Sequence, residues 1–235
     1  MKKVLTMISL LSLMSGAVSA LDMAALERAM ANPDRPAADK ERDASRKAPA
    51  VLDFMGIEPG MTVLDINASA GWYTEVLSYA VGSDGKVYMQ NRPGGRSAEA
   101  AAARAARLAN VEPWDGEVSA IPAGTVDFAL TALNFHDFHN SNPAAAQELL
   151  KATMAALKQG GVLGIIDHEG TPGADNQSLH RIAFDDAVKA VLASGFALVG
   201  ASDVLNNDAD DHSVGPFDPS LGRNTDRIVL KFMKL

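Results

Sequence analysis

The feature that most constrains the fold of this chain is a regular alternation of short apolar runs with longer amphipathic or alanine-rich runs. Residues 61–66 are apolar and β-branched on both faces, as expected for a strand buried in a parallel sheet. Strand followed by helix, repeated along the chain, predicts a doubly wound, Rossmann-like α/β sheet. We therefore expect strands at residues 61–66, 85–90, 125–133 and 161–167, and helices at residues 72–80, 97–109, 143–157 and 184–194.

The C-terminal part of the chain departs from this alternation. Residues 196–204 and 227–232 are both strand-like, and no helical pattern separates them. We expect them to be antiparallel neighbours at one side of a sheet that is otherwise mostly parallel. The residues between them, 206–225, are rich in Asp, Asn, Gly and Pro, which predicts a long loop that is either disordered or functional.

The first twenty residues have the layout of a secretory signal peptide. Lys2 and Lys3 precede an apolar run, and small residues lead to a cleavage site after Ala20, which predicts a periplasmic or secreted protein. A membrane anchor is the alternative, but the run is short and no lipid-accepting cysteine follows it. The expected organisation is a signal peptide at residues 1–20, an N-terminal arm and helix at 21–56, and an α/β domain at 57–235.

The segment before the α/β domain is charged and has a helical period that prolines interrupt. It predicts a loose arm, then a helix that packs Val51, Leu52 and Met55 on the main body. The mixed charges of residues 39–47 indicate a solvated face.

Composition excludes several classes of protein and of partner. The chain of 235 residues has 21 Lys and Arg against 29 Asp and Glu, and loss of Lys2 and Lys3 with the signal peptide would change the formal charge from -8 to -10. An acidic surface repels phosphate backbones, so we expect a small-molecule substrate and no nucleic acid.

The absence of cysteine excludes disulfides and thiol chemistry. No later run approaches the ~18 apolar residues of a membrane span, so we expect no stable membrane insertion after cleavage. The oligomeric state is left open.

Polar residues cluster where the expected strands end. In an open α/β sheet, ligands bind outside the carboxyl ends of the strands. His136 and Asp137 follow one expected strand, and Asp167 and His168 end the next one, so the four should lie close together. All five histidines of the chain fall in expected strand ends or loops and none in a helix interior. Imidazole beside carboxylate suits general acid–base catalysis, or a divalent metal site.

A structural role for these histidines is the alternative. Single histidines in loops often cap helices, and adjacent residues of a strand point to opposite faces, so His136 and Asp137 converge only if the strand has already ended. No histidine spacing in the chain identifies a particular metal.

Short motifs along the chain point to a known family. Residues 63–65 (VLD) precede a turn of small residues that ends in Gly71, and residues 126–128 (VDF) and 157–162 (LKQGGV) follow in order. With them the chain resembles class I S-adenosylmethionine-dependent methyltransferases, and more narrowly the exported, signal-peptide-bearing predicted methyltransferases. The similarity runs from about Arg35 to Leu235. The motifs shared with the narrower group are GWYTE at 71–75, FHD at 135–137, IDH at 166–168, LHR at 179–181, DDH at 210–212 and TDR at 225–227.

The resemblance implies S-adenosylmethionine as the cofactor and assigns residues to its pocket. In the family, the turn after the first strand reads acid-x-Gly-x-Gly-x-Gly and lets the backbone approach the ligand. The second strand of family members ends in an acid for the ribose, and a further acid often lies near the adenine. Two of the three glycines and the ribose acid are replaced here. The positions that match the family pattern are Asp65, Asn67, Ser69, Gly71, Asn91 and Glu117.

Two functions are compatible with these residues. The first is an exported S-adenosylmethionine-dependent methyltransferase of unknown acceptor, in which His136 or His168 is the base that deprotonates the acceptor. The second is a protein of the same fold that has lost S-adenosylmethionine binding and uses the Asp and His residues of the strand ends for a metal or a small periplasmic ligand.

Overall fold

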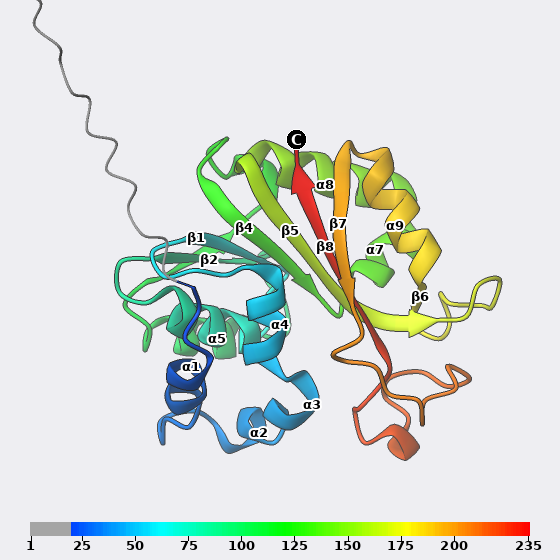
Figure 1. Ribbon diagram of the computed structural model, residues 1–235, viewed down its shortest axis with the longest axis horizontal. Coiled ribbons are helices and arrows are strands. Elements are labelled where there is room, and N and C mark those ends of the chain that lie inside the picture. Colours follow the sequence, from blue (N-terminus) through cyan, green and yellow to red (C-terminus); the bar gives the residue numbers. More distant parts are fainter. Residues whose placement is uncertain (1–19) are drawn as a thin grey trace, which may run out of the picture.

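A central β-sheet with helices on both faces organises the molecule, as the ribbon diagram shows (Figure 1). The computed structural model describes residues 20–235, and the expected signal peptide therefore lies almost wholly outside the described residues. Within residues 20–235 the strands form an eight-stranded sheet of order β3-β2-β1-β4-β5-β8-β7, with β6 paired to β5. The strands are β1 Thr62–Ile66, β2 Lys86–Asn91, β3 Val111–Asp115, β4 Val126–Ala132, β5 Leu157–Gly170, β6 Ile182–Ala183, β7 Phe196–Ser202 and β8 Arg227–Lys234.

Strand direction confirms the predicted fold class. The pairs from β3 to β5 across the sheet are parallel, whereas β8 runs antiparallel to both β5 and β7. The order reverses between β1 and β4, because the chain first builds outward to β3 and then returns to the other side of β1. Such a reversal leaves a crevice at the carboxyl ends of the two strands, where ligands of doubly wound sheets bind.

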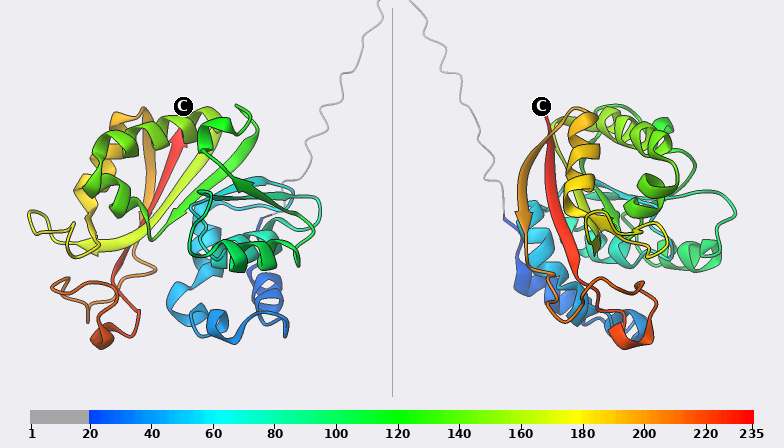
Figure 2. Two further views of the ribbon diagram at one scale, coloured as in Figure 1. Left: turned by 180° about the vertical axis from the view of Figure 1, so that it is seen from behind. Right: turned by 90° about the vertical axis from the view of Figure 1, so that its right-hand side faces the viewer.

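Helices cover the two faces in two groups, seen from behind and from the side in Figure 2. Helices α7, α8 and α9 contribute to the core of one face, and α1, α4 and α5 to the core of the other. The helices are α1 Met23–Met30, α2 Ala37–Lys40, α3 Asp43–Arg46, α4 Ala48–Met55, α5 Trp72–Val81, α6 Ala98–Ala105, α7 Phe135–Ser141, α8 Pro143–Ala156 and α9 Phe184–Ala193, with short 3-10 turns η1 Val118–Ala120 and η2 Pro219–Leu221.

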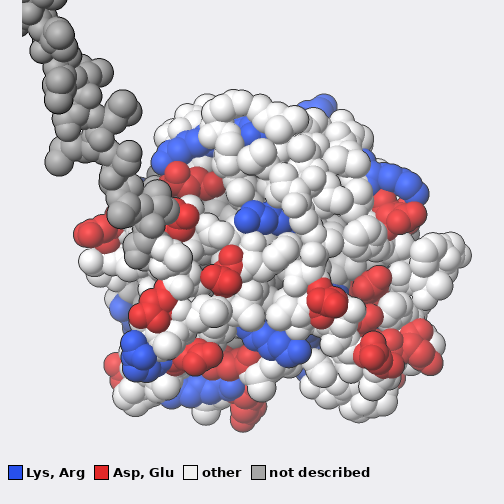
Figure 3. Space-filling model, in the orientation of Figure 1, with Lys and Arg blue, Asp and Glu red and all other residues white. Residues whose placement is uncertain are grey.

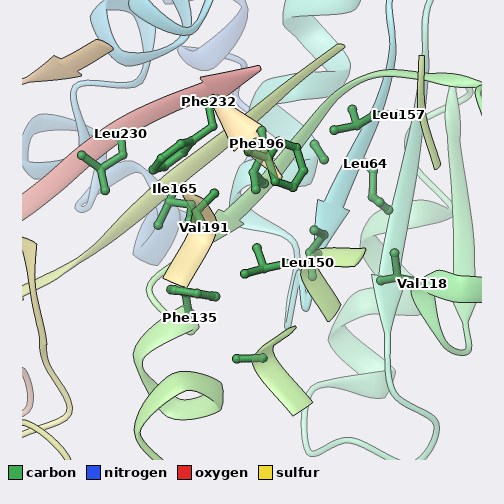
Figure 4. Packing of buried hydrophobic residues seen from close by; sticks show 14 of the residues in the cluster. Leu64, Val118, Phe135, Leu150, Leu157, Ile165, Val191, Phe196, Leu230 and Phe232 are labelled. Carbon is green, nitrogen blue, oxygen red and sulfur yellow. The ribbon is translucent and has the colours of Figure 1, made fainter. Parts of the chain in front are cut away.

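The two cores follow from the period of two along each strand. In β1, Val63 faces the α4 and α5 side while Leu64 faces the α8 side, and both are fully buried. Figure 4 shows the α8 side, where Leu150 and Val191 from the helices meet Ile165 from β5. Strands that bury apolar side chains on both faces explain why the sequence reads as continuous apolar runs.

The N-terminal segment is more ordered than the sequence suggests. The expected helix is α4, and its Val51, Leu52 and Met55 are buried as predicted. It ends at Met55, and the next residue, Gly56, has a φ of 79°, the left-handed conformation that glycine favours after a helix. The prediction that the residues before this helix form a loose arm is wrong, because α1 packs on α4 and α5 through buried residues such as Met30.

Three further details differ from the expectation. Helix α6 ends at Ala105, four residues early, and the unpredicted edge strand β3 follows it. The residues after β4 form the short helix α7 and not an extended strand end, so His136 and His139 lie in a helix. Strand β5 extends beyond its predicted end to Gly170.

The surface and the helices give two further observations. On the face in Figure 3, acidic and basic side chains are interspersed. Among residues 20–235, no helix is both long and apolar enough to cross a membrane.

Candidate functional site

The turn between β1 and α5 has the backbone of a glycine-rich turn without its glycines. Asn67, Ser69 and Gly71 have φ values of 51°, 55° and 81°, so all three lie in the left-handed region that glycine favours. Only Gly71 is a glycine. The alternation of left-handed residues turns the chain sharply from the end of β1 into the N-terminus of α5.

Amide side chains from the end of β2 hold this turn in place. Gln90 Oε1 accepts a hydrogen bond from the Asn67 backbone N–H at 2.9 Å. The Asn91 side chain binds Ser69 on both sides: its Oδ1 accepts from the Ser69 N–H at 2.8 Å, and its Nδ2 donates to the Ser69 carbonyl at 3.1 Å. These bonds offset the conformational cost of a left-handed Asn and Ser.

Gly71 is required by both its conformation and its surroundings. A Cβ atom on Gly71 would lie 2.5 Å from Met89 Cε and 2.8 Å from Arg104 Cδ. The Arg104 guanidinium beneath the turn pairs with Glu75 and with Asp39. The turn therefore sits directly on a buried ion-pair network, and no side chain fits between them.

Asp65 is a buried acid at the end of β1. Its Oδ2 accepts a hydrogen bond from Thr74 Oγ1 at 2.6 Å. Burial raises the pKa of Asp65 to about 7, although the Thr74 hydrogen bonds and the positive charges of Arg46 and Arg104 act in the opposite direction. The carboxyl group is thus poised to take up a negative charge when a cation approaches it.

A cavity of about 600 Å³ opens above this turn. Asp65, the turn residues 67–71 and Asn134 line it from the sheet side. A second cavity of about 380 Å³ adjoins it, since Asn67 and Asn134 line both. Both lie at the carboxyl ends of β1 and β4, which is where the strand order reverses. A hollow of about 800 Å³ at the opposite, amino-terminal ends of β2 and β3 has neither this position nor a comparable cluster of titratable groups.

Arginines give the larger cavity a positive wall. The guanidinium carbon of Arg46 lies 4.4 Å from the ring centroid of Trp72 and 5.3 Å from that of Tyr73. Arg227 is buried, and its guanidinium group donates to the carbonyls of Ser45 and Arg223 and to the Thr225 hydroxyl. Within residues 20–235 neither Arg46 nor Arg227 pairs with a carboxylate.

Burial lowers the pKa of both guanidinium groups. In Arg46 the neighbouring positive charges of Arg42 and Arg227 add to the effect. An anion bound between Arg46 and Arg227 would relieve this repulsion.

The expected histidine and carboxylate residues meet around Asp167. The buried Asp167 carboxylate accepts from the His136 backbone N–H at 2.7 Å and from the His168 backbone N–H at 2.8 Å, and it lies 2.6 Å from His136 Nδ1. His136 and Asp137 converge because β4 has ended and α7 has begun. Sequence adjacency therefore places the two side chains on one helical turn, with His136 Nε2 3.3 Å from Asp137 Oδ1.

The pKa values of the two buried histidines, His136 and His168, are shifted in opposite directions. Burial lowers the pKa of His136, but the hydrogen bond and charge of Asp167 outweigh it, so the pKa is raised. Burial and then the positive charges of Arg227 and His136 hold the pKa of His168 well below its ordinary value. His168 lines the larger cavity as a neutral imidazole, and its Nδ1 lies 2.6 Å from Thr225 Oγ1.

The long segment between β7 and β8 is tied to this site by a buried ion pair. Arg181 Nη2 donates to both oxygens of Asp210 at 2.8 and 2.9 Å, and both side chains are fully buried. Asp210 also accepts from the Asp226 backbone N–H at 2.8 Å. The segment is thereby ordered, and it contributes Phe217 to the wall of the larger cavity.

Most, but not all, of the expected cofactor residues border the cavities. Asp65, Asn67, Ser69 and Gly71 line the larger one, whereas the Asn91 side chain is used to hold Ser69. Glu117 is exposed, lines neither cavity, and accepts from Trp114 Nε1 through its backbone carbonyl.

Sequence reasoning missed Arg46, Arg227 and His180. Arg46 belongs to residues 39–47, which were expected to form a solvated face. In the structure Asp39 of that segment is buried against Arg104, and Arg46 lines the cavity. Its only signal was the density of arginines in a short stretch before a helix.

Comparisons with known proteins agree on the fold. No protein-family model matches the chain, and no curated protein matches it by sequence. A solved structure of a SAM-dependent methyltransferase from Aquifex aeolicus superposes with a TM-score of 0.63 at 23% identity, covering 91% of this chain and 99% of that one. The 1,6-didemethyltoxoflavin-N1-methyltransferase of Burkholderia thailandensis, solved with S-adenosylhomocysteine bound, gives 0.60 at 19% identity, covering 84% of this chain and 81% of that one.

A third similar structure is the [4+2]-cyclase SpnF, with a TM-score of 0.62 at 17% identity and coverage of 86% of this chain and 84% of that one. The chain therefore has the Rossmann-like fold of class I methyltransferases. Proteins named for different reactions share this fold, so the fold alone does not identify the reaction.

Proposed function

We propose that this chain, which has the methyltransferase fold, is an S-adenosylmethionine-dependent methyltransferase that binds its cofactor in the larger cavity. The observation that carries the proposal is the left-handed backbone at Asn67, Ser69 and Gly71. These are the three positions at which the family pattern has glycine, and they border the cavity. Asn67 and Ser69 stand where the family pattern has glycine, yet the turn keeps the left-handed backbone that glycine favours, so its path along the cavity is preserved.

The charges of the cavity suit the amino-acid end of the cofactor. S-adenosylmethionine carries a carboxylate and an ammonium group there. Arg46 has no carboxylate partner among residues 20–235 and would bind the carboxylate, with Arg227 behind it. Asp65 would face the ammonium group, whose positive charge favours the ionised carboxylate and lowers its pKa from about 7.

Chemistry requires alignment of an acceptor and a place for its proton. When bound, the cofactor supplies an electrophilic methyl group: the acceptor atom bonds to the methyl carbon, and the carbon–sulfur bond breaks with its electron pair going to sulfur. His168 lines the cavity as a neutral imidazole and would take the acceptor's proton on Nε2, with Nδ1 held by Thr225. Holding the acceptor in line with the methyl group supplies most of the rate.

The two remaining expected residues have different proposed roles. Asn91 acts indirectly, because its amide oxygen and one of its two amide N–H groups fix Ser69. The contact of Glu117 with the adenine stays a prediction from the resemblance alone.

Titration of S-adenosylhomocysteine into the purified protein by calorimetry tests the cofactor site. This product needs no acceptor and no turnover. We expect binding in the micromolar range, about -8 kcal/mol. Arg46→Gln should weaken it roughly 10- to 100-fold, since a hydrogen bond to a charged group contributes about 1.5–3 kcal/mol.

Arg96→Gln is the matched control, because Arg96 is exposed, lies outside both cavities and loses the same charge. Absence of binding up to millimolar concentrations would reject the proposal. It would leave the alternative, a protein of this fold that no longer binds the cofactor and uses its Asp and His residues for another ligand.

His168→Gln separates catalysis from cofactor binding. The variant should bind S-adenosylhomocysteine as the unchanged protein does and should lose roughly 10²- to 10⁴-fold in methyl transfer to an identified acceptor. A variant with full turnover would exclude His168 as the proton acceptor.

We further propose that the protein is exported and works on a small molecule outside the cytoplasm. The support is the sequence alone: Lys2 and Lys3, the apolar run after them and the small residues up to Ala20. Cell fractionation followed by N-terminal sequencing tests this proposal. Export predicts a protein that begins at Leu21 in the periplasm or medium, and a cytoplasmic protein that begins at Met1 would refute it.

A further inference from the structure

Three metal-binding side chains converge beside the proposed cofactor site. His136 and Asp137 come from α7, and His180 comes from the loop that precedes β6. His180 Nδ1 lies 2.9 Å from Asp137 Oδ1, and His136 Nε2 lies 3.3 Å from the same oxygen. One donor atom from each of the three residues can be chosen so that all lie within 4.8 Å of one another.

The spacing of these atoms fits the inner coordination sphere of a metal ion. Two donors that each lie about 2.1 Å from a tetrahedral ion are roughly 3.4 Å apart. The distance from His136 Nε2 to Asp137 Oδ1 is close to this value, and the shorter His180 contact is a hydrogen bond that an ion would replace. The Asp137 and His180 side chains are 58% and 48% exposed, so an ion can reach the group without unfolding it.

Asp167 orients His136 as a buried carboxylate does behind a metal-bound histidine. Its Oδ1 lies 2.6 Å from His136 Nδ1, which fixes the proton on that nitrogen and directs the lone pair of Nε2 toward Asp137. Asp167 itself is held by two backbone N–H groups and is fully buried. The outer carboxylate, the imidazole and the open Nε2 are thus in place before any ion binds.

We propose that His136, Asp137 and His180 bind a divalent transition-metal ion such as Zn²⁺ or Co²⁺. Two imidazoles with one carboxylate suit these ions, whereas Mg²⁺ and Ca²⁺ prefer oxygen ligands throughout. Three protein ligands leave at least one coordination position for water or substrate, as in catalytic zinc sites.

The position of the site suggests what the ion does. Asp137 lines the smaller cavity, which adjoins the larger one, and the His136 and His168 ring centroids are 5.7 Å apart. If the protein is the methyltransferase proposed above, the ion would bind an acceptor hydroxyl and lower its pKa next to His168. The metal site itself does not depend on the cofactor.

Titration of Co²⁺ and Zn²⁺ into chelator-treated, full-length protein tests the site. We expect one ion per chain, and Co²⁺ should give the visible absorption of a site with nitrogen ligands. His180→Ala and Asp137→Asn change exposed side chains that the fold does not need. Each should weaken binding by at least the roughly 10- to 100-fold that follows loss of an outer-shell partner.

His212→Ala is the matched control, because His212 also lies beside a carboxylate, 3.0 Å from Asp226, but outside the cluster. Unchanged binding in this variant, with loss in the other two, supports the proposal. No binding by the unchanged protein overturns it, as does binding that survives both substitutions in the cluster.

The measurement is separable from the test of the cofactor. Metal titration uses no S-adenosylhomocysteine, so a protein that binds the ion but not the nucleoside keeps this inference and loses the methyltransferase proposal. The reverse result keeps the methyltransferase proposal and removes the metal.

Discussion

Two regions at the carboxyl ends of the strands are stabilised by different interactions. In the turn after β1, neutral amides hold the two left-handed residues that are not glycine, with Gln90 and Asn91 bonded to the backbone at Asn67 and Ser69. The Arg104 guanidinium beneath the turn adds one hydrogen bond, to the Ala70 carbonyl. The histidine region, which consists of His136, Asp167 and His168, is held by buried charges. Asp167 lies against His136, and nearby Arg181 pairs with Asp210. Hydrogen bonds from neighbouring side chains can preserve a backbone while its own residues change, whereas a buried charge fixes the identity of its partner.

The largest expected effect comes from breaking the charged region. Arg181→Met should lower the free energy of unfolding by about 3–5 kcal/mol, because Asp210 is left as an uncompensated buried charge. Denaturant unfolding measures it. Lys151→Met is the control, since the Lys151 pair with Glu148 is exposed and should contribute less than about 1 kcal/mol. Equal effects in the two variants would contradict the assignment of stability to the buried pair.

Asp65, a buried acid beside the turn, should make stability depend on pH. Its pKa of about 7 in the folded protein exceeds the ordinary value of 3.8, so the folded state binds more protons between these values and loses stability as pH rises through them. Asp65→Asn removes this loss. The variant should match the unchanged protein near pH 4 and be more stable above pH 7, by about 4 kcal/mol at most.

Urea unfolding of both proteins at several pH values measures this difference. Parallel stability profiles would show that Asp65 ionises normally in the folded protein. They would also remove one reason to place an ammonium group beside it.

A smaller effect is expected from releasing the turn. Asn91→Ala removes two hydrogen bonds to Ser69 and should cost about 1–3 kcal/mol. Asn91→Asp keeps the acceptor for the Ser69 N–H and loses the donor to its carbonyl, so it should not match the stability of the unchanged protein. Thermal unfolding of both variants compares them. An Ala variant as stable as the unchanged protein would show that the turn holds itself.

The smallest effect is expected from restoring a glycine. Ser69→Gly relieves a left-handed φ of 55° but increases the entropy of the unfolded chain, so the free energy of unfolding should change by less than about 1 kcal/mol. Calorimetric affinity for S-adenosylhomocysteine in the same variant shows whether the Ser69 side chain obstructs the ligand. A large loss of stability would mean that the Ser69 hydroxyl contact with Ser97 matters more than the backbone.

The sheet was predictable because each buried strand is a continuous apolar run and each helix has its own period. Strand β3 was not predicted because it is a short edge strand that contains Pro113, and proline is typical of edge strands and not of central ones. Helix α7 was not predicted because residues 135–141 are rich in His, Asp and Asn, which have low helix propensity. Its formation depends on its place after β4, with Phe135 buried in the core.

The candidate site was predictable only near the carboxyl ends of the expected strands. Asp65 lies next to the last residue of β1 and Asp167 lies in the carboxyl-terminal part of β5, and the fold class places both on the ligand side. Arg46 and Arg227 line one cavity although they lie far apart in the sequence, and no local sequence pattern predicts such a long-range arrangement. His180 reaches Asp137 from a loop whose path no periodicity describes.

The segment between β7 and β8 has a consequence for hydrogen exchange. Its composition resembles that of a disordered linker, yet the backbone N–H groups of Asn207 and Asp226 are bonded to the Asp226 and Asp210 carboxylates, and Asp210 is locked to Arg181. These amides should exchange with solvent only when the histidine region opens as a unit. Two amides at the ends of a stretch with almost no regular secondary structure would thus be among the slowest of the molecule to exchange.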